Sequence, residues 1–184
     1  MTLLSNYEAN HKVLSPQEQT DARRALTESD NAAIEALFST LSQLTGGLVP
    51  ASAAVQHTFR RAGDKTAIVN TAPNDQGFTT YGQSDWSLRD EIIFYRALAR
   101  GCLLAPGGTN YVLRLMRDVT PSQRWGAGSA GYPTSIPLAF KGGWGPDNSG
   151  NYQIRQTAIV GSGDRGYGVH DARSARGRIV RRRN

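Results

Sequence analysis

Hydrophobic residues at helical spacing, flanked by polar capping residues, dominate the first part of the chain. Residues 15–18 (Ser-Pro-Gln-Glu) have the composition of a capping box with proline in the first turn, and they predict a helix ending near Leu26. A second helix is predicted from Asn31 to Leu41, with a buried stripe at Ile34, Leu37, Phe38 and Leu41. The polar loop between them can present its side chains to a cleft.

The middle of the chain has a weaker pattern. Residues 45–85 are rich in Gly, Thr, Asn and Asp, and their composition favours loops. Ser87 is a capping residue for a helix over residues 88–100, and Gly101 supplies its C-terminal stop. A shorter helix is predicted over residues 110–119, before Pro121.

The last third changes to strand-like segments separated by turn residues. Strands are predicted at residues 138–144, 152–160 and 166–170, with turn chemistry at residues 146–150. Helices followed by an antiparallel meander indicate an α+β fold, whereas alternating βαβ units would indicate a parallel sheet.

Charge and composition exclude several classes of function. The net charge of +6 is concentrated in residues 171–184, which contain six arginines and one aspartate, so the rest of the chain is nearly neutral. A basic end without a basic and aromatic surface pattern does not support a nucleic-acid partner. No zinc-ligand spacing or P-loop is present, so no metal or cofactor is predicted. No stretch is long enough to span a membrane, and the start lacks the features of a signal peptide.

Two short polar motifs carry candidate chemistry. Ser29-Asp30-Asn31 precedes the second predicted helix, and Lys141-Gly142-Gly143 lies on the first predicted strand. Together they resemble the second and third signature motifs of the penicillin-recognising serine hydrolases, which include class A β-lactamases and penicillin-binding transpeptidases. The resemblance covers roughly residues 15–169, and further similar segments lie at residues 81–88, 123–126, 140–146 and 152–156.

The resemblance implies a role for each motif residue. In catalysis, Ser29 would relay a proton toward the leaving nitrogen, and Lys141 would attract the substrate carboxylate and tune that relay. In substrate binding, Asn31 would hold the substrate amide. Gly142 and Gly143 would let an acyl group lie along the strand edge, and the backbone N–H of Trp144 would serve an oxyanion hole.

The nucleophile of such a site is missing from the sequence. The family's first motif, S-x-x-K, supplies the attacking serine and its base. The chain has three lysines (Lys12, Lys65 and Lys141), and none has a serine three positions earlier. Gly142 also replaces the family's usual Thr or Ser, and no glutamate lies between Glu35 and Glu91 to activate a deacylating water. The chain alone is therefore predicted to be inactive. An intact parent would be a slow esterase, a carboxypeptidase or a penicillin-binding enzyme.

Both ends depart from the family pattern. The expected organisation is an N-terminal extension over residues 1–14, a partial β-lactamase-like domain over residues 15–170, and a basic, disordered tail over residues 171–184. The N-terminal strands and C-terminal helix of the family's sheet are expected to be absent, which indicates a truncated domain.

Two functions remain open from the sequence. The first is a partial serine hydrolase whose intact parent acts on a β-lactam, peptide or ester substrate. The second is a non-enzymatic module that keeps the cleft and binds peptidoglycan or a protein. The family is typically exported to the periplasm or cell wall, but the location of this chain is not predicted.

Overall fold

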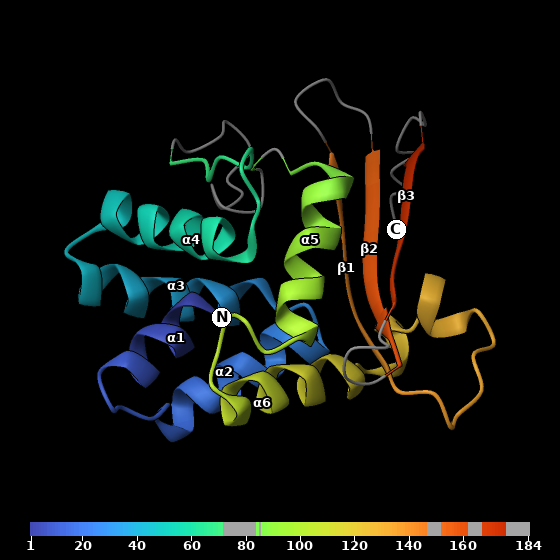
Figure 1. Ribbon diagram of the computed structural model, residues 1–184, viewed down its shortest axis with the longest axis horizontal. Helices are drawn as coiled ribbons and strands as arrows, with labels where there is room; N and C mark the ends of the chain where they lie inside the picture. Colours follow the sequence, from blue (N-terminus) through green and yellow to red (C-terminus); the bar gives the residue numbers. More distant parts are fainter. Residues whose placement is uncertain (72–83, 85, 147–151, 162–166, 176–184) are drawn as a thin grey trace, which may run out of the picture.

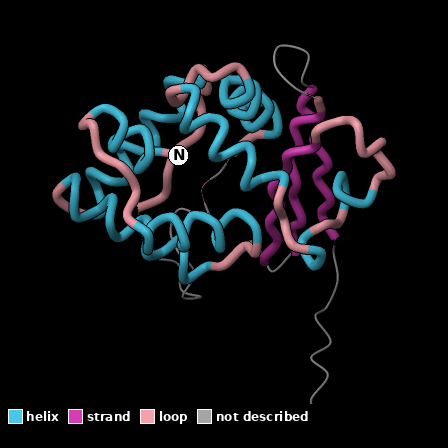
Figure 2. The backbone as a smooth tube through the Cα atoms, turned by 90° about the horizontal axis from the view of Figure 1, so that it is seen from below, coloured by secondary structure: helices cyan, strands magenta, loops and turns pink. Residues whose placement is uncertain are grey.

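Helices on one side and an antiparallel sheet on the other form the two parts of the fold (Figures 1 and 2). The computed structural model describes residues 1–71, 84, 86–146, 152–161 and 167–175. Within these ranges the α-helices are α1 (Thr2–Ala9), α2 (Pro16–Thr27), α3 (Asn31–Thr45), α4 (Leu48–Ala62), α5 (Leu88–Ala99) and α6 (Pro106–Arg117). Two short 3₁₀ turns, η2 (Pro121–Gln123) and η3 (Gly126–Ser129), lead into the sheet.

The sheet has the order β1-β2-β3, with β1 (Leu138–Pro146), β2 (Tyr152–Val160) and β3 (Tyr167–Ala175) antiparallel. In the register, Lys141 is opposite Thr157 and Ala158 is opposite Val169. Helices first and a meander afterwards confirm the predicted α+β class. Strand β1 is an edge of the described sheet, so part of its backbone faces away from β2.

Local capping explains why the predicted helices begin where they do. The Ser15 hydroxyl accepts a hydrogen bond from the Glu18 amide at 3.2 Å, and the Glu18 carboxylate accepts one from the Ser15 amide at 2.7 Å. Ser87 caps α5 by accepting from the Asp90 amide at 3.1 Å. The reciprocal bonds at Ser15 and the single cap at Ser87 satisfy backbone donors that a helix start otherwise leaves unpaired.

Helix α4 corrects the expectation that residues 45–85 are loops. Gly47 precedes the helix and Gly63, at φ 96°, ends it. Ala51, Val55 and Phe59 lie at four-residue spacing, which is helical. The stripe is inconspicuous in the sequence because glycines and polar residues surround it on both sides. The remaining part of that segment includes residues 72–83 and 85, which lie outside the described residues.

The expected boundaries at both ends also shift. Helix α1 lies within residues 1–14, and its Leu3 and Tyr7 are buried with Leu41 and Ala51, so it packs into the helical part rather than extending from it. Strand β3 continues to Ala175, past the expected end of the domain at residue 170. Residues 176–184 and most of the turn predicted at 146–150 lie outside the described residues.

The hydrophobic core is divided. One cluster joins α5 and α6 to the sheet through Leu98, Val112, Met116, Ala139 and Ile159, and a second joins α1, α3 and α4. The predicted stripe of α3 is only partly buried, since Leu41 is 3% exposed but Ile34 is 37% exposed. The two clusters lie on different walls of a cavity described below.

The turn after α4 is organised by a buried carboxylate. Asp64, a residue typical of solvated turns, is 0% exposed. It accepts hydrogen bonds from the amides of Thr66 and Ala67 and from the Trp86 indole, each at 2.9 Å, and Arg60 lies 3.5 Å away. The Trp86 ring in turn stacks on Phe59 at 4.9 Å between centroids. Asp64 thus holds the turn after α4 against the Trp86 side chain.

In the described part of the chain, every helix is too short or too polar to cross a membrane.

Candidate active site

The Ser29-Asp30-Asn31 motif forms the junction between α2 and α3. Asp30 is the N-cap of α3 and accepts a hydrogen bond from the Ala33 amide at 2.9 Å, while its other oxygen pairs with Arg24. The Ala33 amide, and after it the Arg24 guanidinium, hold the pKa of Asp30 below its ordinary value. The middle residue of the motif is therefore structural. It anchors the helix start, which positions Ser29 and Asn31 on either side of it.

Ser29 has a backbone conformation that non-glycine residues rarely adopt. Its φ is 58°, in the left-handed region. Such conformations persist where the surrounding structure holds them, and they are frequent at functional sites. Here the turn directs the Ser29 hydroxyl toward β1.

The Lys141 amine meets the Ser29 hydroxyl across the gap between helices and sheet. Lys141 Nζ donates to Ser29 Oγ at 2.5 Å and to the carbonyl oxygen of Gly142 at 2.5 Å. Ser29 Oγ donates to Gln123 Oε1 at 3.1 Å. The structure thus brings together the two motifs, which lie far apart in the sequence. The hydrogen bonds run in one direction: Lys141 donates to Ser29, and Ser29 donates to the side-chain oxygen of Gln123.

Burial changes the acid–base properties of this lysine. Desolvation lowers the pKa of Lys141 from 10.5 to about 8. The amine can therefore give up or take a proton at moderately alkaline pH. A lysine in this state is able to exchange a proton with the hydroxyl that it contacts.

The lowered pKa predicts a pH-dependent stability. Below about pH 8 the folded state bears the cost of a buried ammonium. Between about pH 8 and 10.5 only the unfolded chain still holds that proton, so the free energy of unfolding rises with pH. Lys141→Met removes this ionisation. We therefore expect wild type to gain stability relative to Lys141→Met as pH rises through this window, measured by urea unfolding. Parallel pH profiles for the two proteins would contradict the expectation.

Gly142 has a structural reason for lacking a side chain. A Cβ at this position would collide with the Trp125 ring, whereas a Cβ at Gly143 would have no atom within 4 Å. Trp125 is held by its carbonyl, which accepts from Gln156 Nε2 at 2.9 Å. Of the glycine pair, only Gly143 borders open space in the described structure. The room expected for an acyl group along the strand edge is therefore present at Gly143 and not at Gly142.

Substituting the two glycines separately tests this difference. We expect Gly142→Ala to lower the free energy of unfolding by about 1–3 kcal/mol, because the packed Trp125 ring must move. Gly143→Ala introduces the same methyl group into open space, and we expect a change below about 0.5 kcal/mol. Chemical denaturation of both variants measures the effect, and equal losses would show that strand geometry, not the Trp125 contact, requires glycine.

The remaining predicted residues also lie at this site. Asn31 is the first residue of α3 and lines the same cavity as Ser29 and Lys141. Trp144 is 50% exposed on β1, and its ring meets Trp125 edge-on at 5.9 Å between centroids. All six candidate residues therefore gather at one end of a single cavity.

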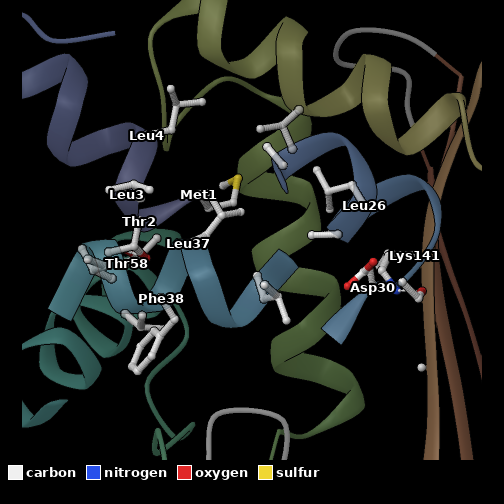
Figure 3. A pocket seen from close by; sticks show the side chains of 18 of the residues that line it. Met1, Thr2, Leu3, Leu4, Leu26, Asp30, Leu37, Phe38, Thr58 and Lys141 are labelled. Carbon is white, nitrogen blue, oxygen red and sulfur yellow. Dashed lines mark hydrogen bonds between the residues drawn. The ribbon is translucent and has the colours of Figure 1, made fainter. Parts of the chain in front are cut away.

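The cavity itself has a volume of about 570 Å³ and runs from the motif residues into the helical part. Figure 3 shows Met1, Leu4, Leu26, Leu37 and Phe38 around it, with Asp30 and Lys141 at the end next to the sheet. The polar motifs thus occupy one end of a large, mainly apolar hollow.

Sequence analysis did not identify Gln123 as a site residue. Its side-chain oxygen accepts from Ser29, and its Nε2 donates to the Glu28 carbonyl at 3.3 Å. In the sequence, Gln123 is distinguished only as the first residue of the segment 123–126, which resembles the penicillin-recognising serine hydrolases. Its contact with Ser29 depends on the turn η2, which sequence spacing does not define.

Comparisons with known proteins bear on the fold. The chain matches no protein-family model, and no curated protein matches its sequence. Its structure is similar to that of the TLA-3 extended-spectrum β-lactamase, with TM-score 0.66 and 12% identity over 95% of this chain and 72% of the other. A class A β-lactamase from Bacteroides cellulosilyticus DSM 14838 gives TM-score 0.68 and 12% identity, covering 97% and 73%. A putative class A β-lactamase, PenP, from Rhodopseudomonas palustris gives 0.60 and 20%, covering 89% and 58%.

The chain therefore has a β-lactamase-like fold, as its two motifs predicted. At 12–20% identity the comparison shows the architecture alone. The chain spans about 70% of the first two structures and 58% of the third. This partial coverage agrees with the expectation of a partial α+β domain.

Proposed function

We propose that this chain carries the proton-relay and substrate-positioning part of a serine acyl-transfer site. The observation that supports the proposal most directly is the hydrogen bond from Lys141 Nζ to Ser29 Oγ at the polar end of the cavity. A hydroxyl that accepts from an amine and donates elsewhere can pass a proton in one direction.

The hydrogen-bond directions define the relay. Ser29 now donates to Gln123 Oε1. A leaving nitrogen placed in the position of that oxygen would receive the Ser29 proton, and the Lys141 ammonium would replace it. The same ammonium would attract a substrate carboxylate, while Asn31 would hold the substrate amide. The substrate class is therefore a β-lactam, peptide or ester with a carboxylate near the reacting bond.

The proposal separates binding from covalent chemistry. Because the chain has no S-x-x-K, the 184 residues alone should bind such a substrate without forming an acyl-enzyme. Benzylpenicillin is a suitable probe. We expect reversible binding by chemical-shift perturbation and no added mass by intact-mass spectrometry. A stable adduct on any serine, or no binding at millimolar ligand, would contradict the proposal.

The lack of S-x-x-K also favours a second candidate, a non-enzymatic module that binds peptidoglycan peptides or a protein through the same cleft. A peptide ending in D-alanyl-D-alanine would then bind reversibly. The two candidates predict different results when a nucleophile is supplied. Acylation by the substrate is expected at an acyl-transfer site, whereas a binding module still binds the substrate only reversibly.

A further inference from the structure

The Ser29 hydroxyl has a single hydrogen, and the direction of that hydrogen decides how the hydroxyl acts toward its neighbours. Lys141 Nζ donates to Ser29 Oγ at 2.5 Å, and Ser29 Oγ donates to Gln123 Oε1 at 3.1 Å. While the hydrogen lies on the side of Gln123, Ser29 can accept from Lys141 but cannot donate to it. The partner that holds this hydrogen therefore sets the role of Ser29.

The orientation of the Gln123 amide follows from its second contact. Its Nε2 donates to the backbone carbonyl oxygen of Glu28 at 3.3 Å. A carbonyl oxygen only accepts hydrogen bonds, so the amide nitrogen faces Glu28 and the amide oxygen faces Ser29. Since the amide oxygen is also an acceptor only, Ser29 supplies the hydrogen in the contact between them. The two hydrogen bonds of Gln123 are thus satisfied by one arrangement.

The backbone on both sides of Gln123 is held by other elements. Before it, the Thr120 amide donates to the Thr27 carbonyl at 2.9 Å, which joins η2 to the end of α2. After it, the Gln156 side chain on β2 accepts from the Ala127 amide at 2.6 Å, and Gln156 is only 3% exposed. Gln123 is therefore supported both from α2 and from the sheet, the two parts that meet at the polar end of the cavity.

We infer that Gln123 is a positioning residue that holds the hydrogen of Ser29 on the side away from Lys141. In this arrangement a Lys141 ammonium has an acceptor in Ser29, whereas a neutral Lys141 amine has no donor there. Gln123 therefore favours the charged form of the lysine, the form that the relay needs in order to return a proton to Ser29. The inference deepens the proposed function, on which the relay role of Ser29 rests.

The carboxylates near Lys141 already have partners. Among the described residues that line the cavity, Asp30 is the one carboxylate, and it is paired with Arg24. On α5, Glu91 accepts at 2.6 Å from the hydroxyl of Thr157, the residue opposite Lys141 in the register. Burial is the cause that lowers the pKa of Lys141. A change in the hydrogen bonding of Ser29 is therefore expected to appear in the titration of this lysine.

Titration of the lysine ε-carbons by NMR tests the inference on the full chain without a ligand. The chain has three lysines, and the exposed Lys12 and Lys65 act as internal references. Gln123→Met keeps the length of the side chain but removes the acceptor, so Ser29 becomes able to donate to a neutral Lys141 amine. We expect the midpoint of the Lys141 titration to fall by about 0.5–1 pH unit, the equivalent of one ordinary hydrogen bond. An unchanged midpoint would overturn the inference.

A second variant gives the opposite expectation. Gln123→Glu keeps an acceptor oxygen and adds a negative charge beside Ser29, so the midpoint of the Lys141 titration should rise. The matched control is Gln43→Met, which makes the methionine change at an exposed position on α3 that does not line the cavity. This control should leave the midpoint unchanged. A fall in the glutamate variant, or an equal response to Gln43→Met, would show that packing and not the acceptor controls Lys141, and would contradict the positioning role.

The same variants separate this inference from the proposed function. Circular dichroism first establishes that each variant is folded. Because the titration uses no substrate, failure of benzylpenicillin to bind wild type would contradict the proposed function and leave the lysine result standing. If wild type binds benzylpenicillin and Gln123→Met keeps the wild-type midpoint, only the positioning role of Gln123 is overturned.

Discussion

Replacing Asp64 with alanine is expected to lower the free energy of unfolding by about 3–5 kcal/mol, the loss typical when one partner of a buried charged network is removed. The Asp64 carboxylate is 0% exposed and accepts from two backbone amides and the Trp86 indole. Alanine leaves these donors buried without acceptors and leaves the Arg60 guanidinium without its carboxylate. Because a typical domain is stable by about 5–15 kcal/mol, we expect the variant to be largely unfolded at moderate temperature.

Circular dichroism and urea unfolding measure this effect, and two variants serve as controls. Asp64→Asn keeps an acceptor oxygen but removes the charge, so its loss should be intermediate. Asp118→Ala removes a carboxylate from an exposed position at the end of α6 and should change stability by less than about 0.5 kcal/mol. A melting curve for Asp64→Ala that superimposes on wild type would show that the buried network contributes little.

Lys141→Met is expected to weaken binding of benzylpenicillin about tenfold to a hundredfold. A hydrogen bond to a charged group contributes about 1.5–3 kcal/mol, which corresponds to this range. Methionine has a similar length without the ammonium, so the cavity stays filled at that point while the carboxylate loses its cation. The same change also frees the Ser29 hydroxyl from its donor.

The matched control for this variant is Lys65→Met, which removes the same charge from an exposed position. Titration by calorimetry or by chemical shifts compares the dissociation constants. A circular dichroism spectrum of Lys141→Met confirms that the variant is folded before binding is measured. Equal dissociation constants for Lys141→Met and Lys65→Met would assign the carboxylate to a different partner and would remove Lys141 from the substrate site.

Ser29 and Lys141 form an ordered hydrogen-bonded pair in a chain whose sequence contains no S-x-x-K motif. The Ser29 turn and β1 are held by local features, namely the Asp30 cap and the antiparallel register with β2. Neither depends on an element inside the cavity. The polar end of the cavity is therefore ordered by contacts among the described residues themselves.

The sequence by itself determined the features that depend on neighbouring residues. The capping box at Ser15 and the cap at Ser87 began helices where predicted, and strand-like segments separated by turn residues located β1 and β2. These signals work because a cap or a turn is formed within a few residues. The order of helices and strands, with two motifs in the expected contexts, was also sufficient to predict the α+β, β-lactamase-like fold.

Only the tertiary structure decided which side chains meet. Helix α4 formed in a segment whose composition favours loops, because its stripe packs on α3 and on the wall of the cavity. Asp64 became buried because the Trp86 indole and two amides converge on it from different segments. Gln123 joined Ser29, and Gly142 met the Trp125 ring, through contacts between elements distant in sequence.

The cavity is the clearest case of this division. The spacing of Ile34, Leu37, Phe38 and Leu41 correctly predicted one apolar face of a helix, but it did not define what that face contacts. Periodicity records the direction of a side chain around its own helix axis, whereas burial depends on whether another element fills the space opposite. For this protein the space opposite is filled at Leu41, which is 3% exposed, and open at Ile34, which is 37% exposed, and only the packing of the helices shows this difference.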